Sequence, residues 1–150
     1  MAILRRNFLP ADLEPELVAT GVDGTVAVQA RQSLEETDWL LSLAQKSSSL
    51  LGVIGWAPIA SENFPAQLDR LRSHYKLKGL RHVIQDEPDE NYINRPDFNR
   101  GITALADTGL VYEILIFDKH LAAAAQFVGR HPNQIFVLDH IAKPRIRSGV

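Results

Sequence analysis

A histidine follows directly after a short apolar stretch near the end of the printed sequence. Residues 135–138 read Ile-Phe-Val-Leu, and Asp139 and His140 come next. A neutral imidazole is the commonest protein ligand of metal ions, and it transfers protons near neutral pH. The alternative is a structural histidine that hydrogen-bonds the next loop. In a regular strand, alternation would place Phe136, Leu138 and His140 on one face and Asp139 on the other.

Arg81, His82 and Gln85 end another apolar stretch. A guanidinium is a fixed fork of donors, which suits a substrate carboxylate or a polarised carbonyl oxygen. Strand alternation allows only one of the neighbours Arg81 and His82 to point to a given face. The alternative for Arg81 is an ion pair with Asp86 or Glu87 a few residues later.

Polar residues end three further apolar stretches. Gln29 and Arg31 close the first stretch, Trp56 closes the second and Asp118 closes the fourth. A parallel α/β barrel builds its site at the carboxyl ends of its strands. The sequence therefore predicts that these side chains share one rim of a sheet.

The apolar stretches themselves predict strands. They are nearly continuous and rich in β-branched residues, as is typical of strands that are covered on both faces. We expect strands at about 24–29, 51–56, 78–84, 111–117 and 135–139. One helical segment joins each pair, so the strands should lie parallel and in chain order.

Capping residues and prolines mark the helices. Ser33 with Glu36 three residues later forms a capping box, which predicts a helix over 34–46. The other helices are expected between Pro10 and Gly21, with Pro65 in the first turn, with Pro96 in the first turn, and at about 119–129 with Asp118 as the cap.

Two folds fit this alternation, a parallel barrel and an open doubly wound sheet. The turn after Val28 reads Ala-Arg-Gln-Ser, without the glycines of a phosphate loop. We therefore favour a parallel (β/α) barrel of TIM type. A closed barrel takes roughly 250 residues, so the 150 residues predict an incomplete barrel that fills a single domain over 1–150.

The composition excludes several classes of protein. Apolar residues make up 45% and charged residues 23%, which is typical of globular domains. The net charge of −2 leaves no basic footprint for nucleic acid. Neither the start, MAILRRNFLP, nor any later segment has the apolar length of a signal peptide or membrane span. We expect a cytoplasmic protein that binds neither membranes nor nucleic acid.

Residue types and motifs narrow the chemistry further. The chain has no cysteine, so metal ligands must come from His, Asp or Glu. It contains no Gly-x-Ser-x-Gly elbow and no His-Glu-x-x-His pair, which argues against serine esterases and zinc peptidases. His74, His120 and His131 lie beside charged residues and are expected at the surface.

Four segments carry a resemblance to a known family: GVDGTVAVQARQSLEETDWLL, LKGLRHVIQDEPD, RPDFNRGITALADTGLVYEILIF and FVLDHIAKPRI. In this order they resemble the middle of the amidohydrolase-related family that includes L-fucono- and L-rhamnono-lactonases and pyrone-dicarboxylate lactonase. The resemblance spans nearly the whole chain. It implies an α/β barrel hydrolase acting on a lactone, a small-molecule substrate.

The resemblance also implies roles for individual residues. His140 corresponds to the active-site histidine, a metal ligand or substrate contact. Arg81 corresponds to the residue that contacts a substrate carboxylate or carbonyl. The other expected substrate-binding residues are His82, Gln85, Gln29 and Lys143. The complete family fold holds a divalent metal, with zinc expected, but some relatives work without one. This chain is expected to supply one metal ligand, which is too few for a zinc site, so it can lack the metal.

Two parts of the family pattern have no counterpart in the sequence. The His-x-His pair of the first strand and the aspartate of the last strand are missing, so residues 22–142 match about strands two to six of eight. We therefore expect a piece of a lactone hydrolase, with open sheet edges that favour homo-oligomers. The alternative is a non-catalytic remnant that binds a small ligand or a protein partner.

Overall fold

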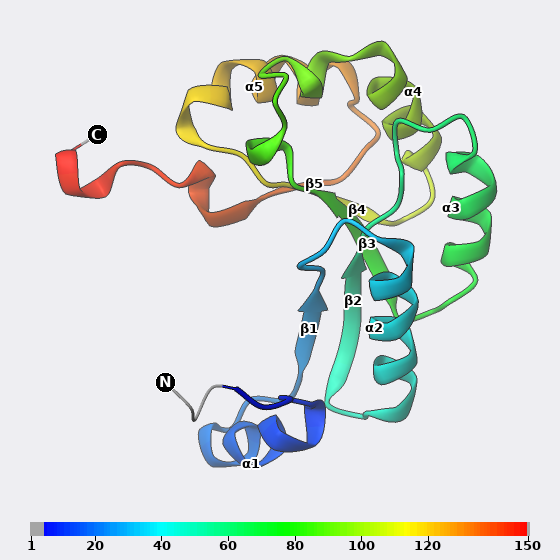
Figure 1. The fold of residues 1–150 in the computed structure, drawn as a ribbon, viewed down its shortest axis with the longest axis vertical. Coiled ribbons are helices and arrows are strands. Elements are labelled where there is room, and N and C mark those ends of the chain that lie inside the picture. The colour runs from blue at the N-terminus through cyan, green and yellow to red at the C-terminus, as the bar shows by residue number, and fades with distance from the viewer. Residues whose placement is uncertain (1–4, 150) are drawn as a thin grey trace.

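Five parallel strands form the centre of the computed structural model, which describes residues 5–149 (Figure 1). The strands are β1 (Thr25–Val28), β2 (Leu50–Gly55), β3 (Leu77–His82), β4 (Val111–Ile114) and β5 (Phe136–Leu138). Every neighbouring pair is parallel and follows chain order. The predicted topology is confirmed. Met1–Leu4, part of the segment tested for a signal peptide, lies outside the described residues.

The helices lie where capping and proline signals predicted them. They are α1 (Pro10–Thr20), α2 (Leu34–Lys46), α3 (Phe64–Arg72), α4 (Pro96–Leu105) and α5 (Leu121–Arg130). Asp118 does not cap α5, because a 3-10 turn over Asp118–His120 precedes that helix. No helix within residues 5–149 combines the length and apolar character needed to cross a bilayer.

Half of the predicted capping box forms at the start of α2. The Ser33 hydroxyl accepts a hydrogen bond from the Glu36 backbone N–H at 3.2 Å. The Glu36 carboxylate, however, accepts from the backbone N–H groups of Ala30 and Arg31, at 3.0 and 2.6 Å. Glu36 therefore fixes the turn that leads out of β1 at the carboxyl edge of the sheet.

The sheet curls so that helices α2 to α5 follow its convex side while its concave side stays open (Figure 1). Ala27 packs against the core between sheet and helices, so its neighbours Val26 and Val28 face the concave side, where both are exposed. On the far edge Val137 is likewise exposed. The described residues therefore form an open half barrel, in agreement with the predicted incomplete barrel.

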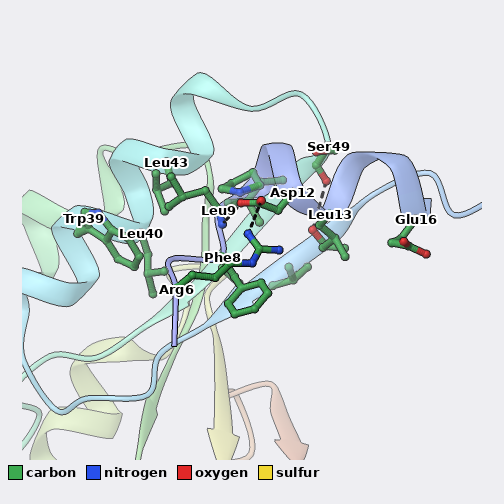
Figure 2. Close-up of a pocket in the computed structure, with 15 residues that line it drawn as sticks. Arg6, Phe8, Leu9, Asp12, Leu13, Glu16, Trp39, Leu40, Leu43 and Ser49 are labelled. Carbon is green, nitrogen blue, oxygen red and sulfur yellow. Dashed lines mark hydrogen bonds and ion pairs between the residues drawn. The ribbon is translucent and has the colours of Figure 1, made fainter. Parts of the chain in front are cut away.

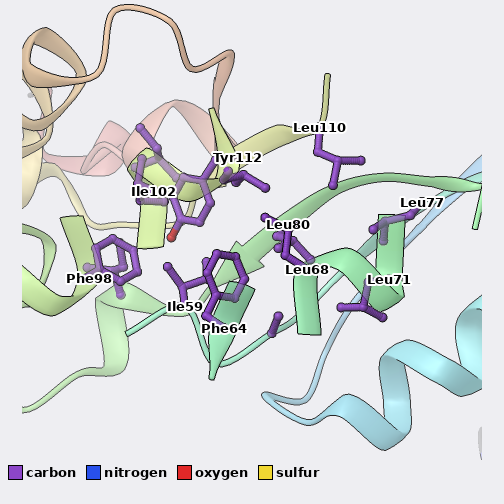
Figure 3. Packing of buried hydrophobic residues seen from close by; sticks show 14 of the residues in the cluster. Ile59, Phe64, Leu68, Leu71, Leu77, Leu80, Phe98, Ile102, Leu110 and Tyr112 are labelled. Carbon is purple, nitrogen blue, oxygen red and sulfur yellow. The ribbon is translucent and has the colours of Figure 1, made fainter. Parts of the chain in front are cut away.

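An apolar core fills the space between the sheet and the outer helices (Figure 3). Phe98 of α4 packs on Tyr112 of β4 and on Phe127 of α5, with ring centroids 5.9 Å apart in both pairs. Leu80 of β3 is fully buried in the same cluster. These contacts identify Leu80 and Tyr112 as outward-facing residues, so the residues that alternate with them face the concave side.

All five strands end before the residue that the sequence predicts, β3 by two residues, β4 by three and the others by one. β3 stops at His82, because a 3-10 turn follows over Ile84–Asp86. β4 stops at Ile114 and β5 at Leu138. After β5 the backbone turns left-handed, with φ between 51° and 55° over residues 140–143. Since non-glycine residues seldom adopt this conformation, the turn is a strained exit from the sheet.

Candidate active site at the carboxyl edge of the sheet

Arg81 of β3 links three strands on the concave side. Its Nη1 donates to Asp139 Oδ2 at 2.9 Å, just beyond β5, and its Nη2 donates to the backbone carbonyl of Gln29 beyond β1. Glu113 of β4 pairs in register with Arg81, and its Oε2 lies 3.9 Å from Nη1. The side chains of Arg81, Asp139 and Glu113 are only 13%, 9% and 14% exposed.

The partner of Arg81 differs from the alternative that the sequence suggested. That alternative placed an ion pair with Asp86 or Glu87, nearby in the chain. The structure pairs Arg81 with Asp139 instead, 58 residues away. Because parallel strands bring their carboxyl ends to one edge, residues distant in sequence meet there.

Gln29 is buried and holds Arg81 in return. Its Nε2 donates to the Arg81 carbonyl oxygen at 3.3 Å, so the two residues bridge β1 and β3 in both directions across β2. The residue is 1% exposed, and its Oε1 has no hydrogen-bond partner among the described residues. The structure thus places this predicted substrate contact beneath the rim, as a support for Arg81.

His82 points the other way, into the helical layer. Its Nδ1 accepts a hydrogen bond from Trp56 Nε1 at 3.2 Å. Since indole nitrogen can only donate, the ring proton sits on Nε2, which lies 2.6 Å from Glu87 Oε1. The ring of Tyr92 stacks on His82 with centroids 4.8 Å apart. Both ring nitrogens are therefore occupied by protein partners.

The burial of His82 also affects its protonation. Desolvation lowers the pKa of the imidazole, and the hydrogen bond and charge of Glu87 act in the opposite direction. Burial further raises the pKa of the stacked Tyr92 phenol to about 12. His82 is accordingly a neutral, fixed side chain.

Lys143 and Gln85 meet above the sheet edge. Lys143 Nζ donates to Gln85 Oε1 at 2.5 Å and lies 5.3 Å from the centroid of the Phe117 ring. The Gln85 backbone N–H donates to the Leu115 carbonyl, which extends the link between the β3 and β4 ends. These two predicted substrate-binding residues are brought together, and both stay partly exposed.

His140 lies in the left-handed turn and is exposed. The expectation from strand alternation does not apply, because β5 has already ended at Leu138. Its neighbour Asp139, rather than His140, contacts Arg81. Within residues 5–149 no three His, Cys, Asp or Glu side chains lie close enough to hold a metal ion. The described residues do not by themselves fit the metal site that the resemblance implied, and we assign no reaction step to a metal.

Sequence reasoning missed Glu113. Burial raises the pKa of this carboxyl group, the charge of Asp139 adds to the shift, and Arg81 opposes it. The signal was present, because Glu113 interrupts an otherwise apolar stretch at 111–117. Only the strand register shows that it lies opposite Arg81.

The expectation that His120 lies at the surface was wrong. The residue is buried, and its Nδ1 accepts a hydrogen bond from the Phe117 backbone N–H at 3.2 Å. The His120 side chain thereby caps the start of the 3-10 turn that precedes α5. A polar ring that caps its own turn can be buried without a charge partner.

A cavity lies at the opposite end of the sheet (Figure 2). It measures about 730 Å³ and lies between α1, α2 and the first residues of β1 and β2. Its walls are mainly apolar, including Leu13, Trp39 and Leu43, with the Arg6–Asp12 ion pair at 2.7 Å on one side. Parallel barrels act at the carboxyl ends of their strands, whereas this cavity lies at the amino ends.

A curled parallel sheet with buried charges at its carboxyl edge is the architecture of (β/α)-barrel enzymes. A family model described as Amidohydrolase matches residues 2–150, and the chain belongs to that family. This confirms the family resemblance and the barrel-type fold predicted from the sequence.

Two curated relatives carry the name L-fucono-1,5-lactonase. The protein from Burkholderia ambifaria is 38% identical over 96% of this chain and 50% of its own length. The protein from Burkholderia multivorans is 35% identical over 97% of this chain and 49% of its own length. The chain thus spans about half the length of these relatives.

Solved structures agree in fold. A crystal structure of an amidohydrolase from Burkholderia multivorans with bound zinc superposes with a TM-score of 0.88 at 35% identity, over 96% of this chain and 51% of that one. An amidohydrolase from Bifidobacterium longum subsp. infantis, 20% identical, gives a TM-score of 0.68 over 97% of this chain and 54% of that one. The second likeness supports the fold alone.

Proposed function

We propose that the chain forms part of the barrel of a hydrolase that opens a sugar lactone. Residues 1–150 would act as one unit, and the carboxyl edge of the sheet would form one wall of the substrate site. The relatives named L-fucono-1,5-lactonase support this substrate class. L-Fucono-1,5-lactone is therefore the first substrate to test.

One observation carries the proposal: Arg81, Asp139 and Glu113 meet on the concave face at the carboxyl edge. Burying three ionised groups is costly, even where they are paired. Apolar residues at these positions would stabilise the fold more than buried charges do. A cluster of buried charges is therefore typical of a functional site. The position of this cluster coincides with the edge at which barrel enzymes bind substrate.

Lactone opening requires three actions by the protein. Water must add to the ring carbonyl, the negative charge on that oxygen must be stabilised, and the ring C–O bond must break to give a hydroxy acid. We assign the partly exposed Lys143 ammonium to the carbonyl oxygen, with Gln85 holding it in place. We assign the exposed His140 imidazole to proton transfer.

Three of the predicted substrate-binding residues, Gln29, Arg81 and His82, take positioning roles in this proposal. Gln29 holds Arg81, which in turn holds Asp139 beside the turn that carries His140. His82 is fixed between Trp56 and Glu87 within the helical layer. None of these three side chains is required to touch the substrate.

The test measures hydrolysis of L-fucono-1,5-lactone by the chain. A pH indicator monitors the reaction through the proton that it releases. We expect turnover above the spontaneous rate, and a loss of about a hundredfold or more with His140→Ala. Lys143→Ala should lower kcat, since the contact forms with the developing oxyanion. His74→Ala, a histidine remote from this edge, is the matched control. Full turnover by the His140→Ala variant would contradict the role of that residue.

A second candidate function is binding without catalysis. The exposed Val26, Val28 and Val137 on the concave side favour it, because such a face attracts a partner. A chain that binds neither lactone nor sugar acid yet associates through this face would support the second function over the first.

A further inference from the structure

We propose that Glu113 binds hydroxyl groups of the substrate from the floor of the concave face. The inference rests on the proposed function, because it takes a polyhydroxylated sugar lactone, or the acid derived from it, as the ligand. It adds a binding residue that neither the sequence motifs nor the family resemblance indicated.

The first step is the direction of the side chain. Tyr112 and Ile114, the neighbours of Glu113 in β4, are buried in the core beneath the helices. Strand alternation therefore turns Glu113 to the concave side. It pairs in register with Arg81 on one side and with Val137 on the other, so it lies between β3 and β5 on that face.

The second step is the bonding of the carboxylate. Among the described residues no donor hydrogen-bonds it, and the nearest cation, Arg81 Nη1, lies 3.9 Å away. The Oδ2 atom of Asp139 lies closer to the same nitrogen, at 2.9 Å. A carboxylate that is 14% exposed and lacks a close donor has lost much of its hydration without full compensation.

The third step concerns which hydrogen-bonding groups of Arg81 and Glu113 the protein itself leaves unused. Two nitrogens of Arg81 are engaged by Asp139 and the Gln29 carbonyl, and its Nε is buried. Arg81 is thus largely committed to the protein, whereas the acceptor oxygens of Glu113 remain available. Sugar-derived ligands carry several hydroxyl donors, and hydrogen bonds from neutral donors to a carboxylate are stronger than those to neutral acceptors.

A structural explanation competes with this inference. If Glu113 served mainly as a second partner of Arg81, its removal would destabilise the fold. If it serves as a binding group, removing its charge should leave stability unchanged or raise it, because the desolvation cost disappears. The two explanations therefore predict different stabilities for a variant without the charge: lower in the first case, unchanged or higher in the second.

The experiment measures binding and stability of the same variants. Calorimetric titration of the chain with L-fuconate, the acid formed by opening L-fucono-1,5-lactone, gives the affinity, and hexanoate serves as a hydroxyl-free acid of equal charge. We expect L-fuconate to bind more tightly than hexanoate. Glu113→Gln should lower the affinity for L-fuconate by about tenfold, and Glu113→Ala should lower it by about a hundredfold. The urea midpoint of Glu113→Gln should match or exceed that of the unmodified chain.

Each outcome distinguishes the inference from the proposed function. Glu14→Gln, an exposed glutamate of α1, is the matched control and should bind L-fuconate unchanged. Unchanged affinity in Glu113→Gln, or a parallel loss of stability and affinity, overturns the inference and leaves the proposed function standing. Absence of L-fuconate binding by the unmodified chain overturns both.

Discussion

At the residue scale, Arg81 ties the ends of β1 and β5 to β3 through its two terminal nitrogens. A guanidinium suits this position because its planar fork can serve two acceptors that lie in different directions. Lysine carries the same charge but presents it as a single point. The two side chains are therefore not equivalent here.

Arg81→Lys should lower the free energy of unfolding by about 1–3 kcal/mol, since one charged hydrogen bond is lost and an acceptor is left buried. Urea denaturation measures the change. Arg100→Lys, at an exposed position of α4, is the matched control and should stay within about 0.5 kcal/mol. Equal stability of Arg81→Lys and the unmodified chain would mean that the bond to Asp139 or to Gln29 contributes little.

His82 predicts how stability depends on pH. Burial lowers the pKa of its imidazole in the folded chain below the unfolded value of 6.5. Below pH 6.5 the unfolded state then binds more protons, so stability falls as the pH drops from 6.5 through the folded pKa. His82→Gln should flatten this part of the stability profile, measured by denaturation at a series of pH values. His140→Gln, at an exposed histidine, should retain the slope; a slope that survives in His82→Gln would contradict the assignment.

At the element scale, close packing decides where α4 can lie. A Cβ added to Gly101 would lie 2.0 Å from the backbone oxygen of Ile59, so α4 approaches the loop after β2 through a residue without a side chain. This contact brings Phe98 of the same helix over the sheet. A Cβ added to Gly129 of α5, in contrast, would have no atom within 4 Å apart from its chain neighbours and the backbone of its own helix.

These two helical glycines should respond in opposite directions to alanine. Gly101→Ala should destabilise the chain by about 1–3 kcal/mol or more, because backbone atoms cannot yield as a flexible side chain does. Gly129→Ala should stabilise it by about 0.5–1 kcal/mol, since alanine has the higher helix propensity and meets no clash. Chemical denaturation of both variants measures the effects, and equal changes would show that the close approach to Ile59 is relaxed in solution.

At the scale of the whole molecule, β1 and β5 are edge strands of the described sheet, and its concave face carries exposed valines. Unpaired strand edges and exposed apolar surface both promote association. The five-stranded half barrel is therefore expected to associate with itself in solution.

Sedimentation velocity should show dimers or larger species at micromolar concentration. The double variant Val26→Lys and Val137→Lys should shift the population towards monomer, because lysine on an edge strand opposes pairing. Val18→Lys, at a position of α1 that is 83% exposed, is the matched control and should leave the distribution unchanged. A compact monomer with a cooperative thermal transition, in the unmodified chain, would refute the expectation.

The sequence by itself determined the elements and their order. Near-continuous apolar stretches identified the strands, and Ser33 and the prolines marked the helix starts, because both signals depend on neighbouring residues only. Parallel pairing followed from one helix between each pair of strands. The resemblance of four segments also sufficed for the family, which the match over residues 2–150 bears out.

The tertiary structure decided which side chains meet. Arg81 joins Asp139 across 58 residues and Gln29 across 52, and Glu113 lies opposite Arg81, because strand register sets these contacts. The strand ends also depended on context, as the left-handed turn after β5 shows. Local patterns describe how a residue sits in its own element, whereas a buried charge takes the partner that the neighbouring strands bring within reach.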